Sequence, residues 1–435
     1  MMLPIMIMNV TQALFSLVDM TVLGNFAASP EAGDKAVGAV GACSFIIVLI
    51  TGLLIGISVG ANVIVAKYVG AGDIRRAEKA AGASILFAFV GGLALLVVGV
   101  VFARVFLVWT NCDEKLLFDA TTYFRLYFLG VPFLLIYNFA AAVLRALGDT
   151  KRPMYILIIG SVSKIIFNFV FIAFFNMDVL GVAIATIIFD IIVGSLCFAA
   201  LFDKTLAIGF KLSDCRFYGS ELKEMLKVGI PAGIQQALYC FANVIILTAV
   251  NVLGENATTG LTVANQFDNI LYQIALATSF AATPYMAQNI GAGNFTRVKK
   301  AFFSSILITV AFGATLGALS AYFSPELSSL MTSTPAVIEY SCQKMIIVSS
   351  TYFICGINEV LAGALRGVGK PIVPTVTAMI FLCALRFIWV WFVFPYCPDN
   401  LTYLYLVWPI GWTLSIIVHL IIYIPTMKKL EKSQA

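Results

Sequence analysis

The sequence is poor in charged residues. Asp, Glu, Lys and Arg make up 11% of its 435 residues and hydrophobic residues make up 61%, whereas about a quarter of a soluble domain is charged. This is too little charge to cover a water-exposed surface, which excludes a soluble globular protein, a disordered chain and a nucleic-acid-binding domain. The mean hydropathy of +0.99 indicates a polytopic membrane protein, because the apolar content suffices for about a dozen helices at ~20 residues per span.

The sequence also lacks the residues of common catalytic centres. It has one histidine, His419, so a His-based metal site or a Ser–His triad is hard to build. The nine cysteines are scattered singly without a CxxC pair, which is typical of buried apolar thiols. No GxxxxGK[ST] motif for nucleotide phosphates occurs. We therefore expect neither an enzyme nor a bound cofactor. Any step that requires energy is expected to use an ion gradient rather than ATP.

Apolar runs bounded by charges or by Gly and Pro clusters predict an all-α integral membrane protein with twelve spans. The predicted spans are 3–25, 37–69, 83–108, 120–145, 153–175, 180–202, 228–253, 260–290, 301–325, 338–365, 372–395 and 401–427. A polar stretch, residues 203–227, separates the first six from the last six.

The basic residues orient these spans. Of the 27 Lys and Arg residues, 20 fall in the loops after even-numbered spans and in the C-terminal tail. Five others, Lys344 among them, are assigned to the opposite side and its span ends, and Lys164 and Arg386 lie within spans. The positive-inside rule then predicts that both termini are cytoplasmic. A miscount by one helix would destroy this bias, which supports the count of twelve spans. The net charge of +5 therefore reflects the placement of basic residues on the cytoplasmic side and not a nucleic-acid-binding surface.

The chain is a tandem repeat. AKYVGAGDIRRAEKA after span 2 corresponds to AQNIGAGNFTRVKKA after span 8, and LRALGDTKRP corresponds to LRGVGKPIVP at the same offset of 221 residues. We therefore predict an N-lobe (1–202), a cytoplasmic linker (203–227) and a C-lobe (228–435). Each lobe has six helices, so the repeats are parallel and face a central cavity, as in alternating-access transporters. A duplication without a transport role and a channel are the alternatives.

Span 2 carries glycines at four-residue spacing, namely Gly52, Gly56 and Gly60. Glycines at this spacing form a ridge on one helix face that lets a neighbouring helix approach closely. We interpret the ridge as a packing surface.

These motifs resemble the multidrug and toxic compound extrusion (MATE) family over essentially the whole chain. The resemblance rests on the VD pair of span 1, GISVGANVIVAKYVGAGD, LRALGDTKRPM, LKVGIPAGIQQ, QNIGAG, LRGVGKPIVP and RFIW, in this order. It favours the DinF-like prokaryotic branch. It implies a monomer in the bacterial cytoplasmic (inner) membrane that exports amphipathic, often cationic small molecules in exchange for H⁺ or Na⁺. A flippase for lipid-linked saccharides or other lipids of the same superfamily is the rival interpretation, against which we count the lack of a basic cavity.

Charged side chains inside the membrane are costly and mark functional sites. Asp19 in span 1 occupies the position of the family's coupling acid, and its repeat partner is Asn243. The resemblance adds Asn168 and Thr186 to this coupling site, but the family's second acid is replaced by Ile172. A Na⁺ site at Asp19, Asn168 and Thr186 would thereby lose a hard oxygen ligand, so H⁺ is the preferred coupling ion.

Asp190 is the candidate substitute for the missing acid. It lies one turn beyond Thr186 on span 6, and Lys164 lies one turn before Asn168 on span 5. A pair between Lys164 and Asp190 or Asp19 would tune the carboxylate in the transport cycle. A static ion pair that stabilises the N-lobe is an equal alternative.

The C-lobe carries the candidate substrate cavity. Asp268 lies in a polar stretch with Gln266 and could attract a cationic substrate, and Glu359 is predicted to pair with Arg386. The aromatic side chains of Tyr239, Tyr272 and Trp389 are expected beside them, because aromatic faces attract desolvated cations.

Overall fold

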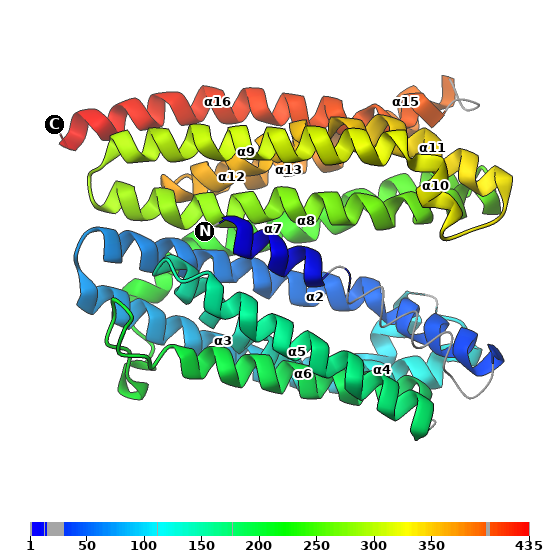
Figure 1. Cartoon of the computed structure of the whole chain (residues 1–435), viewed down its shortest axis with the longest axis horizontal. Coiled ribbons are helices and arrows are strands. Elements are labelled where there is room, and N and C mark those ends of the chain that lie inside the picture. The colour runs from blue at the N-terminus through cyan, green and yellow to red at the C-terminus, as the bar shows by residue number, and fades with distance from the viewer. Residues whose placement is uncertain are drawn as a thin grey trace. The chain divides into compact units, whose positions relative to one another are not determined.

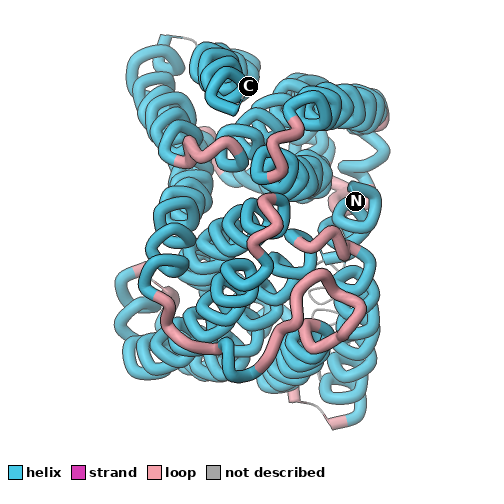
Figure 2. Tube along the Cα trace, turned by 90° about the vertical axis from the view of Figure 1, so that its left-hand side faces the viewer, coloured by secondary structure: helices cyan, strands magenta, loops and turns pink. Residues whose placement is uncertain are grey.

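The computed structural model describes residues 2–12, 14, 30–110, 112–175, 177–396 and 401–434. Its elements are helices, and no strand occurs in these ranges (Figure 2). The chain divides into two compact units: unit 1 contains residues 11–233, and unit 2 contains residues 2–10 together with 234–435. The long helix α7 (Gly219–Asn251) runs across this division.

Unit 1 is built around α4, more than half of whose residues are buried, and its helices are labelled in Figure 1. Its helices are α2 (Pro30–Gly70), α3 (Ile74–Trp109), α4 (Glu114–Ala146), α5 (Lys151–Phe169) with the π-turn Val170–Phe174, α6 (Asp178–Ala200) and the first half of α7. Helix α4 packs against α2, α3 and α6, and α5 packs against α6. Helix α4 is therefore the central helix of the unit.

Unit 2 contains residues 2–10 of the N-terminal helix Met2–Gln12 and the second half of α7. It continues with α8 (Glu255–Gly291), α9 (Phe295–Tyr322), α10 (Ser324–Ser329), α11 (Pro335–Val348), α12 (Tyr352–Gly367), α13 (Ile372–Ala378), α14 (Leu385–Ile388), α15 (Leu401–Tyr405) and α16 (Val407–Gln434). Short 3₁₀ and π turns join α11 to α12 and α13 to α14. Helix α8 packs against α9, α11 and α12.

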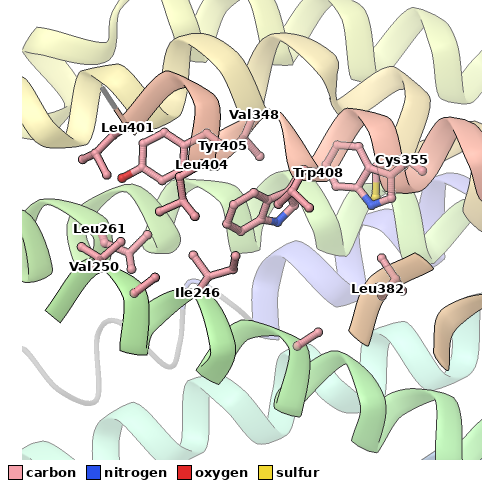
Figure 3. Close-up of a cluster of buried hydrophobic side chains, with 14 of the residues drawn as sticks. Ile246, Val250, Leu261, Val348, Cys355, Leu382, Leu401, Leu404, Tyr405 and Trp408 are labelled. Carbon is pink, nitrogen blue, oxygen red and sulfur yellow. The ribbon is translucent and has the colours of Figure 1, made fainter. Parts of the chain in front are cut away.

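A hydrophobic core fills the end of unit 2 where α7 meets α8 (Figure 3). Tyr405 and Trp408 come from α15 and α16, and they pack with Ile246 of α7, Leu261 of α8 and Val348 of α11. These helices are apolar on their inward faces, and their close van der Waals packing stabilises the bundle, because lipid is as apolar as these side chains.

The helices follow the predicted spans closely. Ten helices of the described residues are long and apolar enough to cross a membrane, and they correspond to predicted spans 2–7 and 9–12. Span 8 is α8, a continuous helix of 37 residues that is not among the ten because polar residues lower its hydropathy. Span 1 begins with Met2–Gln12, and most of its remainder lies outside the described residues.

The repeat is confirmed in the backbone at its two glycine motifs. Gly72 and Gly293 have φ of 75° and 69°, and Gly148 and Gly369 have φ of 91° and 81°. Positive φ is accessible to glycine at little cost. The offset of 221 residues therefore relates positions with the same backbone requirement.

The helix that follows each first motif starts in the same way. Asp73 caps α3 by accepting from the backbone N–H of Arg76, and Asn294 caps α9 by accepting from that of Arg297. Asp and Asn are equally good N-caps, so the change between the repeats preserves the local structure.

The glycine ridge of α2 packs against the first half of α7 within unit 1. A Cβ at Gly56 would lie 2.5 Å from the Cα of Gly233, and a Cβ at Gly60 would overlap the carbonyl oxygen of Met225. Gly52 has no atom within 4 Å of the same position. Two of the three glycines are therefore required by close helix packing.

We expect Gly60→Ala to destabilise the protein by about 1–3 kcal/mol, since an extra methyl group in a filled contact forces the helices apart. Gly52→Ala is the matched control and should be neutral or stabilising by up to ~1 kcal/mol, because alanine favours the helix over glycine. Thermal unfolding of both variants in detergent measures the difference. Equal melting temperatures would contradict this packing.

Candidate functional site

A cavity of about 380 Å³ lies inside unit 2, a volume within the range that holds drug-sized ligands. It is lined by Tyr239, Asn243, Thr262, Asn265, Gln266, Asp268, Asn269, Tyr272, Lys344, Tyr352, Cys355, Arg386, Trp408 and Trp412. Five of these residues are aromatic, three are charged and four carry side-chain amides. The cavity can therefore contact an aromatic ring and a polar or charged group of one molecule.

The cavity lies well inside the helical bundle. Asn243 is eight residues before the end of α7 at Asn251, and Lys344 is nine residues after the start of α11 at Pro335. At ~1.5 Å per residue these positions are about 12–14 Å from the helix ends. A molecule in this cavity would be held at membrane depth.

One wall carries a buried ion pair. Lys344 Nζ lies 2.7 Å from Asp268 Oδ2 and also donates to Asn265 Oδ1. Ser349 Oγ donates to Asp268 Oδ1 at 2.9 Å. Lys344 is 1% exposed and Asp268 is 6% exposed. The charge of Asp268 is therefore balanced inside the wall.

Arg386 is the third charged group and has no such balance. Its Nη1 donates to the neutral Asn243 Oδ1 at 2.9 Å, and its guanidinium lies 4.6 Å from the ring centroid of Trp408. Among the described residues no carboxylate lies within ion-pair distance of Arg386, and its buried Nε has no hydrogen-bond partner. A desolvated cation–π contact is worth ~2 kcal/mol, whereas burying a charge costs several kcal/mol. The formal charges of the described lining residues Asp268, Lys344 and Arg386 therefore sum to one positive charge.

Glu359 lies behind the cavity wall. It is 1% exposed and accepts a hydrogen bond of 2.5 Å from the hydroxyl of Tyr239, which lines the cavity. The predicted ion pair between Glu359 and Arg386 is not formed in the described part of the chain, because Arg386 turns to Asn243 instead. Trp389 does not line the cavity; its indole N–H donates to the carbonyl oxygen of Tyr403 at 2.8 Å.

The other sequence-predicted cavity residues are brought together. Asp268, Gln266, Tyr239, Tyr272 and Arg386 all line the same space, and the rings of Tyr239 and Tyr272 lie 5.8 Å apart.

In unit 1 four of the candidate coupling residues lie on α5 and α6, which pack together. Asp190 is 2% exposed and faces α4, since a Cβ at Gly130 would lie 2.5 Å from its Oδ2. Within the described ranges that oxygen is buried without a hydrogen-bond partner. Lys164 interacts electrostatically with Asp190, and its Nζ lies 5.7 Å from the ring centroid of Phe189.

The remaining described coupling residues, Asn168 and Thr186, are also buried. Asn168 is fully buried at the end of α5. Thr186, 7% exposed, donates its hydroxyl to the carbonyl oxygen of Val182 in its own helix at 2.8 Å. Asp19 lies outside the described residues, so the structure does not place it beside Asp190.

Comparison with known proteins identifies the family. The family model MatE matches residues 4–170 and 231–392. The chain belongs to the MatE family. The probable multidrug resistance protein YoeA of Bacillus subtilis is 27% identical over 388 residues, which cover 86% of this chain and 82% of YoeA. The FAD transporter of Shewanella oneidensis is 24% identical and covers 81% of this chain and 80% of its own length.

The fold is that of MATE transporters. A multidrug resistance MATE transporter of the MOP superfamily, solved in an outward-facing conformation, superposes with a TM-score of 0.91 at 20% identity and covers 99% of this chain and 95% of its own. Such transporters have twelve helices in two lobes. The predicted fold class and family are therefore confirmed, and the chain is a multi-pass membrane transporter by family.

One charged residue of the cavity was misplaced in the interpretation of the sequence. Lys344 was assigned to the outer side of the membrane and its span ends, but it is buried in the cavity wall. A signal was present, because Lys344 is the seventh residue of the predicted span 338–365 and does not lie at its end. Lys344 is paired with Asp268, whereas Arg386 has no carboxylate partner among the described residues, so the described lining carries one excess positive charge. This differs from the expectation that a basic cavity is lacking.

Proposed function

We propose that this protein is a secondary antiporter that exports amphipathic aromatic small molecules in exchange for protons. The observation that carries the proposal is the cavity of unit 2, in which aromatic, amide and buried charged side chains surround about 380 Å³ at membrane depth. Such a mixture can hold a molecule by stacking and hydrogen bonding.

Energy coupling is assigned to unit 1 in this proposal. Asp190 is a buried acid beside Lys164, and Asp19 supplies a second acid from span 1. A buried carboxyl group can hold a proton in one conformation and release it in the other. Proton entry would weaken substrate binding on the outer side, and proton release to the cytoplasm would restore it. Both termini are proposed to be cytoplasmic.

Proton flux in proteoliposomes tests this function. In the wild type, we expect an outward-directed concentration gradient of an aromatic probe to drive protons inward. We expect Asp19→Asn to reduce this coupled flux at least tenfold, because an amide cannot exchange the proton. Asp73→Asn is the matched control, since it makes the same change at an exposed helix cap whose repeat partner is already Asn294. The probes are ethidium, riboflavin and flavin mononucleotide (FMN), which differ in charge.

Four outcomes would contradict the proposal. Proton flux that is independent of every probe would indicate another activity, and conductance without counterflow would indicate a channel. Normal coupling in Asp19→Asn would remove that acid from the mechanism. Dependence of the flux on Na⁺ at constant pH would replace the proton by Na⁺ as the coupling ion.

A flippase for lipid-linked saccharides is the second candidate function. It is favoured by Arg386, the basic group of the cavity that has no carboxylate partner among the described residues, because a lipid-linked sugar carries phosphate. Translocation of a fluorescent polyprenyl phosphate across the same proteoliposomes, detected by chemical quenching of the outer leaflet, distinguishes it from antiport of soluble probes.

A further inference from the structure

We infer that the cavity of unit 2 is a binding site for a planar aromatic organic anion, with Arg386 as the group that receives the negative charge. The inference rests on the proposed function, because it names the substrate class of that cavity. It departs from the cationic substrates that the sequence motifs imply. Its basis is the charge balance and shape of the described residues.

The first step is the charge balance of the cavity wall. Lys344 and Asp268 form a buried pair at 2.7 Å, so they cancel. Arg386 is 3% exposed and its hydrogen-bond acceptor is the neutral Asn243. In the described ranges no further acid lines the cavity. A cation substrate would add a second uncompensated charge, whereas an anion would neutralise the first.

The second step is the donor set. Arg386 Nε is buried without a hydrogen-bond partner in the described part of the chain, and a guanidinium presents its N–H groups as a planar fork that matches carboxylate and phosphate oxygens. The amide side chains of Asn265, Gln266 and Asn269 line the same space and can donate to further oxygens.

The third step is the aromatic wall. The guanidinium carbon of Arg386 lies 4.6 Å from the ring centroid of Trp408. Trp412 and Tyr352 also line the cavity, and their ring centroids are 5.5 Å apart. Tyr239 and Tyr272 also line the cavity. Aromatic side chains in this arrangement accept a flat ring by offset or edge-to-face stacking. The ligand is therefore an aromatic molecule that bears a carboxylate, sulfonate or phosphate.

FMN and riboflavin test the inference directly, because they share one ring system and differ by a phosphate. Binding is measured on purified protein in detergent by quenching of tryptophan fluorescence, to which Trp408 and Trp412 contribute from the cavity wall. We expect the wild type to bind FMN at least tenfold more tightly than riboflavin, and ethidium more weakly than either. Inorganic phosphate at the concentration of FMN should not displace it, because it lacks the ring.

Variants assign the preference to Arg386. Arg386→Gln should weaken FMN binding about tenfold and leave riboflavin within twofold. Arg386→Lys should lie between, since lysine keeps the charge but lacks the planar fork. Lys300→Gln is the control, because it removes one exposed positive charge of the same unit outside the cavity.

Several results would overturn the inference. Equal affinities of the wild type for FMN and riboflavin would do so, as would no binding of FMN or tighter binding of ethidium, and none of these depends on a variant that folds. An unchanged FMN preference in Arg386→Gln would place the anion elsewhere, and displacement by phosphate alone would remove the aromatic requirement. Because no gradient is used, failure of binding is distinguishable from failure of antiport.

Discussion

Replacing Lys344 with methionine is expected to lower the free energy of unfolding by about 3 kcal/mol or more. Lys344 and Asp268 form an ion pair with Nζ 2.7 Å from Oδ2 in the cavity wall, and both side chains are almost completely buried. Removing one partner leaves the other charge in a low-dielectric interior, which costs about 3–5 kcal/mol. The loss is expected although the methionine side chain fills nearly the same volume.

The second half of this prediction concerns the double variant. Lys344→Met with Asp268→Asn should recover most of the lost stability, because an amide is neutral and still accepts from Ser349, which donates to Asp268 at 2.9 Å. Thermal unfolding of the two single variants and the double variant forms a double-mutant cycle. Additive effects would show that the pair is not coupled.

An exposed ion pair of the same unit provides the matched control. Lys299 Nζ lies 2.9 Å from Glu431 Oε1, and the two side chains are 53% and 44% exposed. Exposed pairs contribute about 0–1 kcal/mol. Lys299→Met should therefore change the melting temperature little, although its ion pair is almost as short.

Replacing Asp190 with asparagine is expected to reduce coupled proton flux at least tenfold and to leave the protein folded. Asp190 is 2% exposed, faces Gly130 of α4 and interacts electrostatically with Lys164. Asparagine has nearly the same shape, so the contact with Gly130 is kept while the exchangeable proton is lost. Proteoliposome flux measured between pH 5.5 and 8 gives both the rate and its pH dependence.

The pH dependence separates coupling from a static ion pair. If Asp190 carries the proton, the variant should lose the pH dependence of probe export. If it only stabilises unit 1, the variant should unfold at a lower temperature but keep the wild-type pH profile. Asp73→Asn, the exposed cap substitution, should change neither. A wild-type profile in Asp190→Asn would therefore remove this residue from the coupling path.

The sequence was sufficient for the architecture. Hydropathy predicted ten helices that the structure forms as apolar spans, and also α8. The repeat offset of 221 residues pairs Gly72 with Gly293, and both have a positive φ in the structure. These properties depend on short stretches of chain, because a helix must satisfy its own backbone in lipid and a turn residue must adopt its own φ.

The candidate cavity was predicted in part. Asp268, Gln266, Tyr239, Tyr272 and Arg386 were named from the sequence and line one space. From the sequence, Asp268 was a candidate to attract a cationic substrate, but Lys344 of the same wall already neutralises its charge. Polar residues in an apolar span indicate that a site exists, while its charge depends on which of them are paired.

What the sequence by itself determined is the class of protein, the helices, the repeat and the family motifs. The tertiary structure decided the sign of the net charge of the cavity's lining residues. Arg386 meets Asn243 across 143 residues of sequence, and Lys344 meets Asp268 from a different helix. Net charge within a membrane-spanning bundle is the outcome of such contacts between distant segments. A list of charged residues along the chain does not contain it.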